Sequence, residues 1–153
     1  MQHTRLADWL RWQETLHPQA IDLGLDRVRR VLARLGLQAA RHLVITVAGT
    51  NGKGSTTQMV TRLLMAHGLT VGTYSSPHLE RLNERISRNA EPISDEDFAE
   101  QIAALAEIEI VAGVRPTYFE LVTAAAFRWF ADVAVDVAVV EVGMLGKWDA
   151  TNV

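Results

Sequence analysis

The sequence predicts an α/β fold in which helices flank a mostly parallel sheet. An apolar run, Leu43–Ala48, leads directly into the glycine-rich segment Gly49–Ser55, which is followed by a helical pattern. A second run, Val135–Val142, is apolar at almost every position, which is typical of a strand buried on both faces of a sheet. Strands of this kind that alternate with helices indicate a parallel arrangement.

Two helices are expected before the first strand. Residues 6–13 place apolar side chains at helical spacing, and the pattern breaks at Pro18. A second helical face runs from Leu25 to Leu35 and ends at Gly36, because glycine commonly follows the last turn of a helix.

The next elements form a βαβ unit. Strand Leu43–Ala48 is followed by a helix over Thr56–His67, which Gly68 ends, and by a second strand over Thr70–Tyr74. Strands joined through a helix are parallel, and such a connection is almost always right-handed. We therefore expect both strands to end at the same edge of the sheet.

Helix signals also mark the second half of the chain. Ser94 precedes three acidic residues and an apolar helical face, as expected for an N-cap. Thr117 and Glu120 stand three residues apart at the start of a further helix, which resembles a capping box. Three parallel strands make a thin sheet, because open sheets of this class usually have about five or six. We therefore expect residues 1–153 to be the N-terminal part of one domain, with the remainder supplied by a longer protein or elsewhere.

Composition limits the possible functions. The chain of 153 residues has a net charge of −3, its 15 Lys and Arg residues are scattered, and it has no cysteine. Nucleic acid is therefore a poor candidate partner, and disulfides and thiolate metal sites are excluded. No apolar run approaches the ~20 residues that cross a bilayer, and the N-terminus lacks the apolar core of a signal peptide. A soluble cytoplasmic protein is expected.

The segment Gly49–Ser55 has the features of a phosphate-binding loop. Glycines allow consecutive backbone N–H groups to converge on one point, the following helix adds the positive end of its dipole, and Lys53 can reach terminal phosphates. The spacing differs from the general Walker A pattern, because Val47 replaces its first glycine and Gly54 separates Lys53 from the hydroxyl of Ser55. The alternative is a tight turn that binds nothing. We expect the ligand to be a nucleoside triphosphate.

Hydroxyl residues follow both strands of the βαβ unit. Ser55 or Thr56 could offer its hydroxyl to magnesium or to a phosphate, or could cap the helix. Ser75 or Ser76 could be an oxygen ligand at the same edge of the sheet, although a plain Ser-Pro turn is the alternative. His78 is more often a hydrogen-bonded structural histidine than a ligand or a base.

Glu141 stands at the carboxyl end of the last predicted strand, where a lone carboxylate is costly to bury without a cation or a hydrogen-bond partner. Strand ends converge beside the loop in phosphate-binding α/β folds, so magnesium is the expected partner. The alternative is a glutamate that faces solvent or pairs with an arginine. Gly143 and Gly146 favour the metal site, because they permit close approach of the backbone at this edge.

Two aromatic residues lie beside a carboxylate in the segment Thr117–Glu120. Such a cluster could stack on a flat heterocycle and hydrogen-bond to it. It could equally be a capping box whose aromatic side chains join the core. Both interpretations stay open from spacing alone.

Seven segments together resemble bacterial folylpolyglutamate synthase, a family that is often bifunctional with dihydrofolate synthase and belongs to the Mur ligase superfamily. These segments are Ile21–Val28, Val47–Ser55, Ser75–Leu79, Asn83–Ile86, Thr117–Glu120, Glu141–Gly143 and Asp149–Asn152. They cover nearly the whole chain in the family's order. The core Gly49–Lys53 is shared with the Mur ligases of cell-wall synthesis, but Gly54 and the segments at 75–79 and 117–120 resemble the folate branch.

The resemblance implies a Mur ligase-like central ATPase domain, here incomplete, and an ATP-dependent amide ligase. In this family ATP phosphorylates a folate or dihydropteroate carboxylate, and the amino group of L-glutamate displaces phosphate from the acyl phosphate. ATP and Mg²⁺ would be the cofactors. The partners would be small-molecule substrates, without nucleic acid or membrane, and the full-length protein is expected to be a monomer.

The resemblance also implies roles for individual residues, with Lys53 and Glu141 as the catalytic pair. The implied ATP-binding residues are Thr50, Asn51, Gly52, Lys53, Gly54 and Ser55. The implied metal ligands are Ser76 and Glu141. The implied folate- or dihydropteroate-binding residues are Asp22, Leu23, Gly24, Leu25, Thr117, Tyr118, Phe119, Glu120 and Trp148.

Two positions depart from the family pattern. Leu145 replaces a glycine and restricts the backbone angles, and Lys147 replaces an arginine whose bidentate contacts a lysine cannot reproduce. The family's metal-binding histidine and its C-terminal glutamate-binding domain are absent from these residues, so we expect the chain alone to be incomplete for turnover. The alternatives are a Mur-type ligase of cell-wall synthesis and a non-catalytic module that binds a nucleotide or a pterin.

Overall fold

The computed structural model describes residues 6–14, 30, 33, 42–113 and 116–143 of the chain. Its elements in chain order are α1 (Leu6–Glu14), β1 (Leu43–Val47), α3 (Lys53–Ala66), β2 (Val71–Tyr74), the 3-10 helix η1 (Leu82–Arg85), β3 (Ile86–Arg88), β4 (Glu91–Pro92), α4 (Asp95–Ala112), α5 (Tyr118–Asp132) and β5 (Val137–Glu141). No helix in this described part is long and apolar enough to cross a membrane. Of the helix predicted over 25–35, the structure describes only Arg30 and Ala33, and both are helical.

The strands form a five-stranded sheet in the order β1-β5-β2-β3-β4. Strand β5 pairs in parallel with β1 on one side and with β2 on the other, while β3 and β4 add antiparallel pairs. The α/β class and the three parallel strands are confirmed, and the whole sheet is mixed. All five residues of β5 are buried, as its apolar run predicts. The carboxyl ends of β1, β5 and β2 therefore lie side by side.

The antiparallel hairpin β3–β4 was not predicted. Its turn residues Asn89 and Ala90 have positive φ angles of 48° and 64°, which asparagine tolerates and alanine rarely adopts. Asn89 also accepts a hydrogen bond from the backbone N–H of Val71 at 2.9 Å through its Oδ1 atom. Strands of three and two residues leave little periodicity in the sequence, so this hairpin has only a weak signal.

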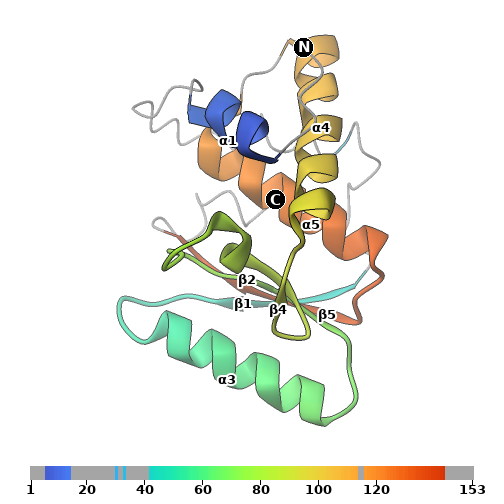
Figure 1. Ribbon diagram of the computed structural model, residues 1–153. Coiled ribbons are helices and arrows are strands. Elements are labelled where there is room, and N and C mark those ends of the chain that lie inside the picture. Colours follow the sequence, from blue (N-terminus) through green and yellow to red (C-terminus); the bar gives the residue numbers. More distant parts are fainter. Residues whose placement is uncertain (1–5, 15–29, 31–32, 34–41, 114–115, 144–153) are drawn as a thin grey trace.

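Helices cover the two faces of the sheet unequally. Figure 1 shows α3 on one face and α1, α4 and α5 on the other. The α3 face is packed around Val47, Val71 and Val139. The opposite face carries the larger core, in which Ala138 and Val140 meet the helices. Successive residues of a strand point to opposite faces, so β5 contributes side chains to both cores.

Helix caps explain where α4 and α5 begin. The hydroxyl of Ser94 accepts a hydrogen bond from the N–H of Asp97 at 3.0 Å. Thr117 and Glu120 form the predicted capping box, in which the Thr117 N–H donates to the Glu120 carboxylate at 2.7 Å and the Glu120 N–H donates to the Thr117 hydroxyl at 3.3 Å. Both predicted starts are confirmed.

Gly72 in β2 faces the ring of Phe130 in α5. A Cβ atom at this position would lie 2.6 Å from Cδ1 and 2.8 Å from Cε1 of that ring, which is fully buried. We expect Gly72→Ala to lower the free energy of unfolding by about 1–3 kcal/mol, because the ring must move within a packed core. Denaturant unfolding measures this loss. The control is Gly54→Ala, where the added Cβ meets no atom within 4 Å, and equal midpoints for the two variants would contradict the prediction.

Candidate active site

Lys53 is the first residue of α3 and reaches across to the end of β5. Its Nζ atom donates hydrogen bonds to the backbone carbonyls of Val142 at 3.1 Å and Gly143 at 2.9 Å. These carbonyls directly follow Glu141, the last residue of β5. The structure therefore brings the Lys53 ammonium group and the backbone beside Glu141 to the same edge of the sheet. This is the edge at which β1 and β2 also end.

The glycine loop has the backbone that its sequence requires. Gly52 is the N-cap of α3 and has a φ angle of 74°, a left-handed conformation that favours glycine. Helix α3 begins at Lys53 and not at Thr56 as the sequence suggested. Ser55 and Thr56 therefore lie inside its first turns, and neither is the capping residue. Both are exposed, as are the other loop residues at 48–52, so the amide groups at this helix end lie near solvent.

Glu141 is a buried carboxylate with little compensation. Glu141 is 5% exposed. The backbone N–H of Ser76 donates a hydrogen bond to its Oε2 atom, and this bond is long, at 3.4 Å. Strand alternation places Glu141 on the same face as Val139, which is the α3 face. A buried carboxylate with so weak a hydrogen bond is stabilised by a cation. The position fits the predicted metal ligand.

Ser76 lies beside Glu141 through the same hydrogen bond. Its hydroxyl and the Glu141 carboxylate are the oxygen donors that Mg²⁺ prefers. The described part of the chain contains no group of three or more His, Cys, Asp or Glu side chains that could hold a metal. Mg²⁺ commonly keeps several waters and binds substrate phosphates, so two protein ligands are compatible with it.

His78 has the structural role that the sequence favoured. Its Nδ1 atom accepts a hydrogen bond from Nε of Arg85 at 2.9 Å. The ring is thus held by a side chain of the same loop.

The segment at 117–120 lies over the end of β2. The rings of Phe119 and Tyr74 are 6.2 Å apart between centroids and tilted by 35°. Tyr118 and Phe119 are half-buried and pack against the larger core, and Glu120 is 5% exposed. The capping box and the packing of both aromatic rings against the core are therefore present. Tyr74 precedes Ser75 and Ser76, so Phe119 is nevertheless close to the edge that carries Glu141.

Several residues of the predicted site lie outside the described part of the chain. These are Asp22, Leu23, Gly24, Leu25, Gly146 and Trp148, together with the divergent positions Leu145 and Lys147. Sequence reasoning in turn missed the two carbonyls that hold Lys53. Backbone acceptors carry no side-chain signature, and only Gly143 hinted at a close approach.

Known proteins match this chain closely. The dihydrofolate synthase/folylpolyglutamate synthase of Escherichia coli (strain K12) is 46% identical over 149 residues, which cover 97% of this chain and 35% of that protein. The structure of E. coli FolC in complex with DHPP and ADP has a TM-score of 0.91 at 42% identity, covering 97% of this chain and 36% of that one. The Yersinia pestis bifunctional enzyme complexed with AMPPNP and Mn ion gives 0.90 at 42% identity, with the same coverage of 97% and 36%.

These relatives all belong to the folate branch, and none is a cell-wall ligase. No protein-family model matches the chain. The chain spans about a third of the length of the relatives that it matches. In sequence and in fold, this chain is therefore homologous to about a third of a dihydrofolate synthase/folylpolyglutamate synthase.

Proposed function

We propose that the chain is the N-terminal part of the ATP-binding domain of an amide ligase. The full-length protein would add L-glutamate to a folate or dihydropteroate carboxylate through an acyl phosphate. The observation that carries this proposal is the meeting of Lys53 with the backbone that follows Glu141, at 2.9 and 3.1 Å. A cation from the glycine loop and a buried carboxylate at one sheet edge suit a triphosphate with its metal ion.

The proposed role of Lys53 follows from its hydrogen bonds. An ammonium group has three N–H donors, and two of them are directed to the carbonyls of Val142 and Gly143. These bonds hold the side chain in place, and the third donor can reach a phosphate oxygen. Backbone N–H groups of Thr50–Ser55 would hold the remaining phosphate oxygens at the N-terminus of α3. A positive charge fixed before the reaction stabilises the transferred phosphoryl group without reorganisation.

Ser76 and Glu141 are the proposed magnesium ligands. Bound Mg²⁺ would neutralise charge on the phosphates during transfer. The Ser76 N–H keeps the Glu141 carboxylate oriented, and burial of this carboxylate strengthens its attraction for a cation. The phosphorylated carboxylate then has a good leaving group, which glutamate displaces.

The proposed folate or dihydropteroate site includes Thr117–Glu120. Phe119 lies against Tyr74, the last residue of β2, where an aromatic face can stack on a planar ring. The other proposed contacts are Asp22, Leu23, Gly24, Leu25 and Trp148. The full-length protein would act on these small molecules as a cytoplasmic monomer.

Phosphate release by the full-length protein tests the proposed function. We expect release only when ATP, glutamate and a pteroate or folate are all present. A UDP-muramoyl substrate in place of the pteroate or folate tests for a Mur-type ligase. Phosphate release with the UDP-muramoyl substrate, but not with a pteroate or folate, would overturn the folate assignment. Calorimetry with ATP and with a pteroate on this chain alone tests for a binding module.

A further inference from the structure

The residues between β2 and β3 form a closed loop that begins beside Glu141. The N–H of Ser75 donates to the carbonyl of Arg85 at 2.9 Å and closes the base of the loop. The next residue, Ser76, donates its N–H to Glu141. Any change in the shape of this loop therefore acts on the proposed metal ligands.

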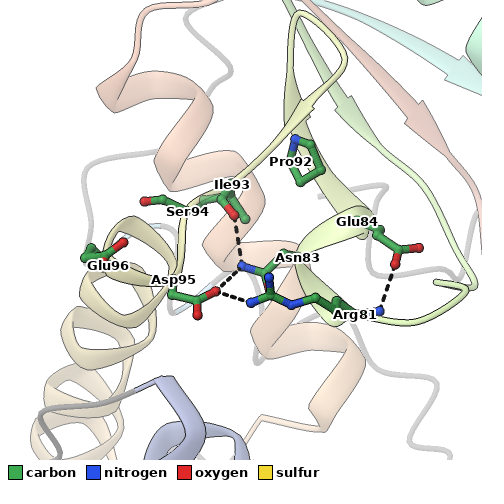
Figure 2. A pocket seen from close by; sticks show the side chains of 8 residues that line it. All are labelled: Arg81, Asn83, Glu84, Pro92, Ile93, Ser94, Asp95 and Glu96. Carbon is green, nitrogen blue, oxygen red and sulfur yellow. Dashed lines mark hydrogen bonds and ion pairs between the residues drawn. The ribbon is translucent and has the colours of Figure 1, made fainter.

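Glu84 holds this loop from within. Its carboxylate accepts three backbone hydrogen bonds, from the N–H groups of Leu79 at 2.8 Å, Glu80 at 3.0 Å and Arg81 at 2.8 Å. Figure 2 shows the last of these bonds at the edge of a surface pocket. The same hydrogen bonds lower the pKa of Glu84 below its usual value, so the carboxylate stays ionised and acts only as an acceptor.

Two further side chains attach the loop to its surroundings. Arg81 pairs with Asp95 at the start of α4 at 2.5 Å, and the side chain of Asn83 donates to Asp95 and to the carbonyl of Ile93, both at 2.9 Å. Figure 2 shows these groups directed toward one another across the pocket. Because its polar groups bond to one another, this pocket offers few free groups to a ligand. Its arrangement anchors the loop to α4.

The outer part of the loop, residues 79–81, contributes little to the hydrophobic core, whereas Leu82 and Asn83, which follow it, are buried. Leu79, at its outer part, is 93% exposed, and Glu80 and Arg81 are also exposed. Three charge-assisted hydrogen bonds therefore fix residues 79–81, whose own burial contributes little to stability. A fixed but exposed segment next to a candidate active site is typical of a functional loop.

We propose that Glu84 is a positioning residue for the ligase reaction. It fixes the loop at 75–85 and thereby keeps Ser76 against Glu141. This inference rests on the proposed function, and it goes beyond that function because the proposed nucleotide and metal sites do not include Glu84. ATP would be held by the glycine loop after β1, which is a separate segment. Loss of Glu84 should therefore slow the chemical step without weakening the binding of ATP.

The test uses Glu84→Gln in the full-length protein. Glutamine has the same shape but replaces one acceptor oxygen with an NH₂ donor, so it cannot accept all three N–H groups. We expect kcat for glutamate-dependent phosphate release to fall about 10- to 100-fold, since small misplacements of reacting groups have effects of this size. KM for ATP and the melting temperature should stay near their wild-type values. Hydrogen exchange at residues 79–81 should become faster.

The matched control is Glu80→Gln, which removes the same charge from an exposed side chain of the same loop. We expect this variant to have the kcat of the wild type and the same rate of hydrogen exchange at residues 79–81. The proposal would be overturned if Glu84→Gln keeps the wild-type kcat, or if Glu80→Gln loses kcat to the same extent. It would also be overturned if the loss of kcat in Glu84→Gln is accompanied by a lower melting temperature. If the wild-type protein shows no glutamate-dependent release, the proposed function fails instead, and hydrogen exchange still decides whether Glu84 holds the loop.

Discussion

Lys53→Ala is expected to abolish phosphoryl transfer in the full-length protein, with a loss of at least about 10²- to 10³-fold in kcat. Removal of one preorganised group that stabilises developing charge typically has an effect of this size. Here the variant loses both the ammonium charge and the hydrogen bonds that hold it on Val142 and Gly143. Phosphate release with ATP, glutamate and a pteroate measures the loss.

Folding should survive this substitution, because Lys53 is only partly buried. Circular dichroism and thermal unfolding check this point. The matched control is Arg62→Ala, which removes a positive charge from an exposed position of the same helix, α3. Turnover retained in Lys53→Ala, or lost equally in Arg62→Ala, would refute the role of Lys53.

Glu141→Gln should have an effect of comparable size on the reaction, for a different reason. The amide keeps the shape of the side chain but removes the negative charge that would hold Mg²⁺. We expect kcat to fall at least about 10²-fold and the Mg²⁺ concentration needed for half-maximal activity to rise. Titration of Mg²⁺ at saturating ATP measures both quantities.

The same variant should separate binding from stability. Glu141 is 5% exposed, and a buried carboxylate without its cation destabilises a fold more than a neutral amide does. Without metal, Glu141→Gln should therefore unfold at the same temperature as the wild type or at a higher one. Added Mg²⁺ and ATP should raise the melting temperature of the wild type more than that of Glu141→Gln. Glu100→Gln, at an exposed position of α4, is the control, and an unchanged Mg²⁺ response in Glu141→Gln would rule out a metal ligand there.

The central part of the fold could be predicted because its signals are local and strong. The apolar run that contains β5 identified a strand buried on both faces. Thr117 and Glu120 identified a helix start through their spacing alone. Parallel strands end at one edge of a sheet, so the meeting of Lys53 with the end of β5 also followed from the sequence.

The remaining features depend on backbone groups that have no sequence signature. The partners of Lys53 are carbonyls that lie 89 and 90 residues away. The partners of Glu84 are N–H groups, which every residue except proline offers. The hairpin turn at Ala90 uses a backbone conformation that alanine rarely adopts. Local propensity therefore gave no reason to expect these contacts.

The position of β5 has a consequence for the order of events during synthesis. Strands β1 and β2 share no ladder with each other, since β5 lies between them, and β5 is the last of the five strands to leave the ribosome. Pairings between distant parts of a chain form slowly and leave apolar edges open to aggregation until they close. The glycine loop thus stays without its carbonyl anchors until translation has passed residue 143, and a nascent chain that stalls earlier leaves the edges of β1 and β2 unpaired.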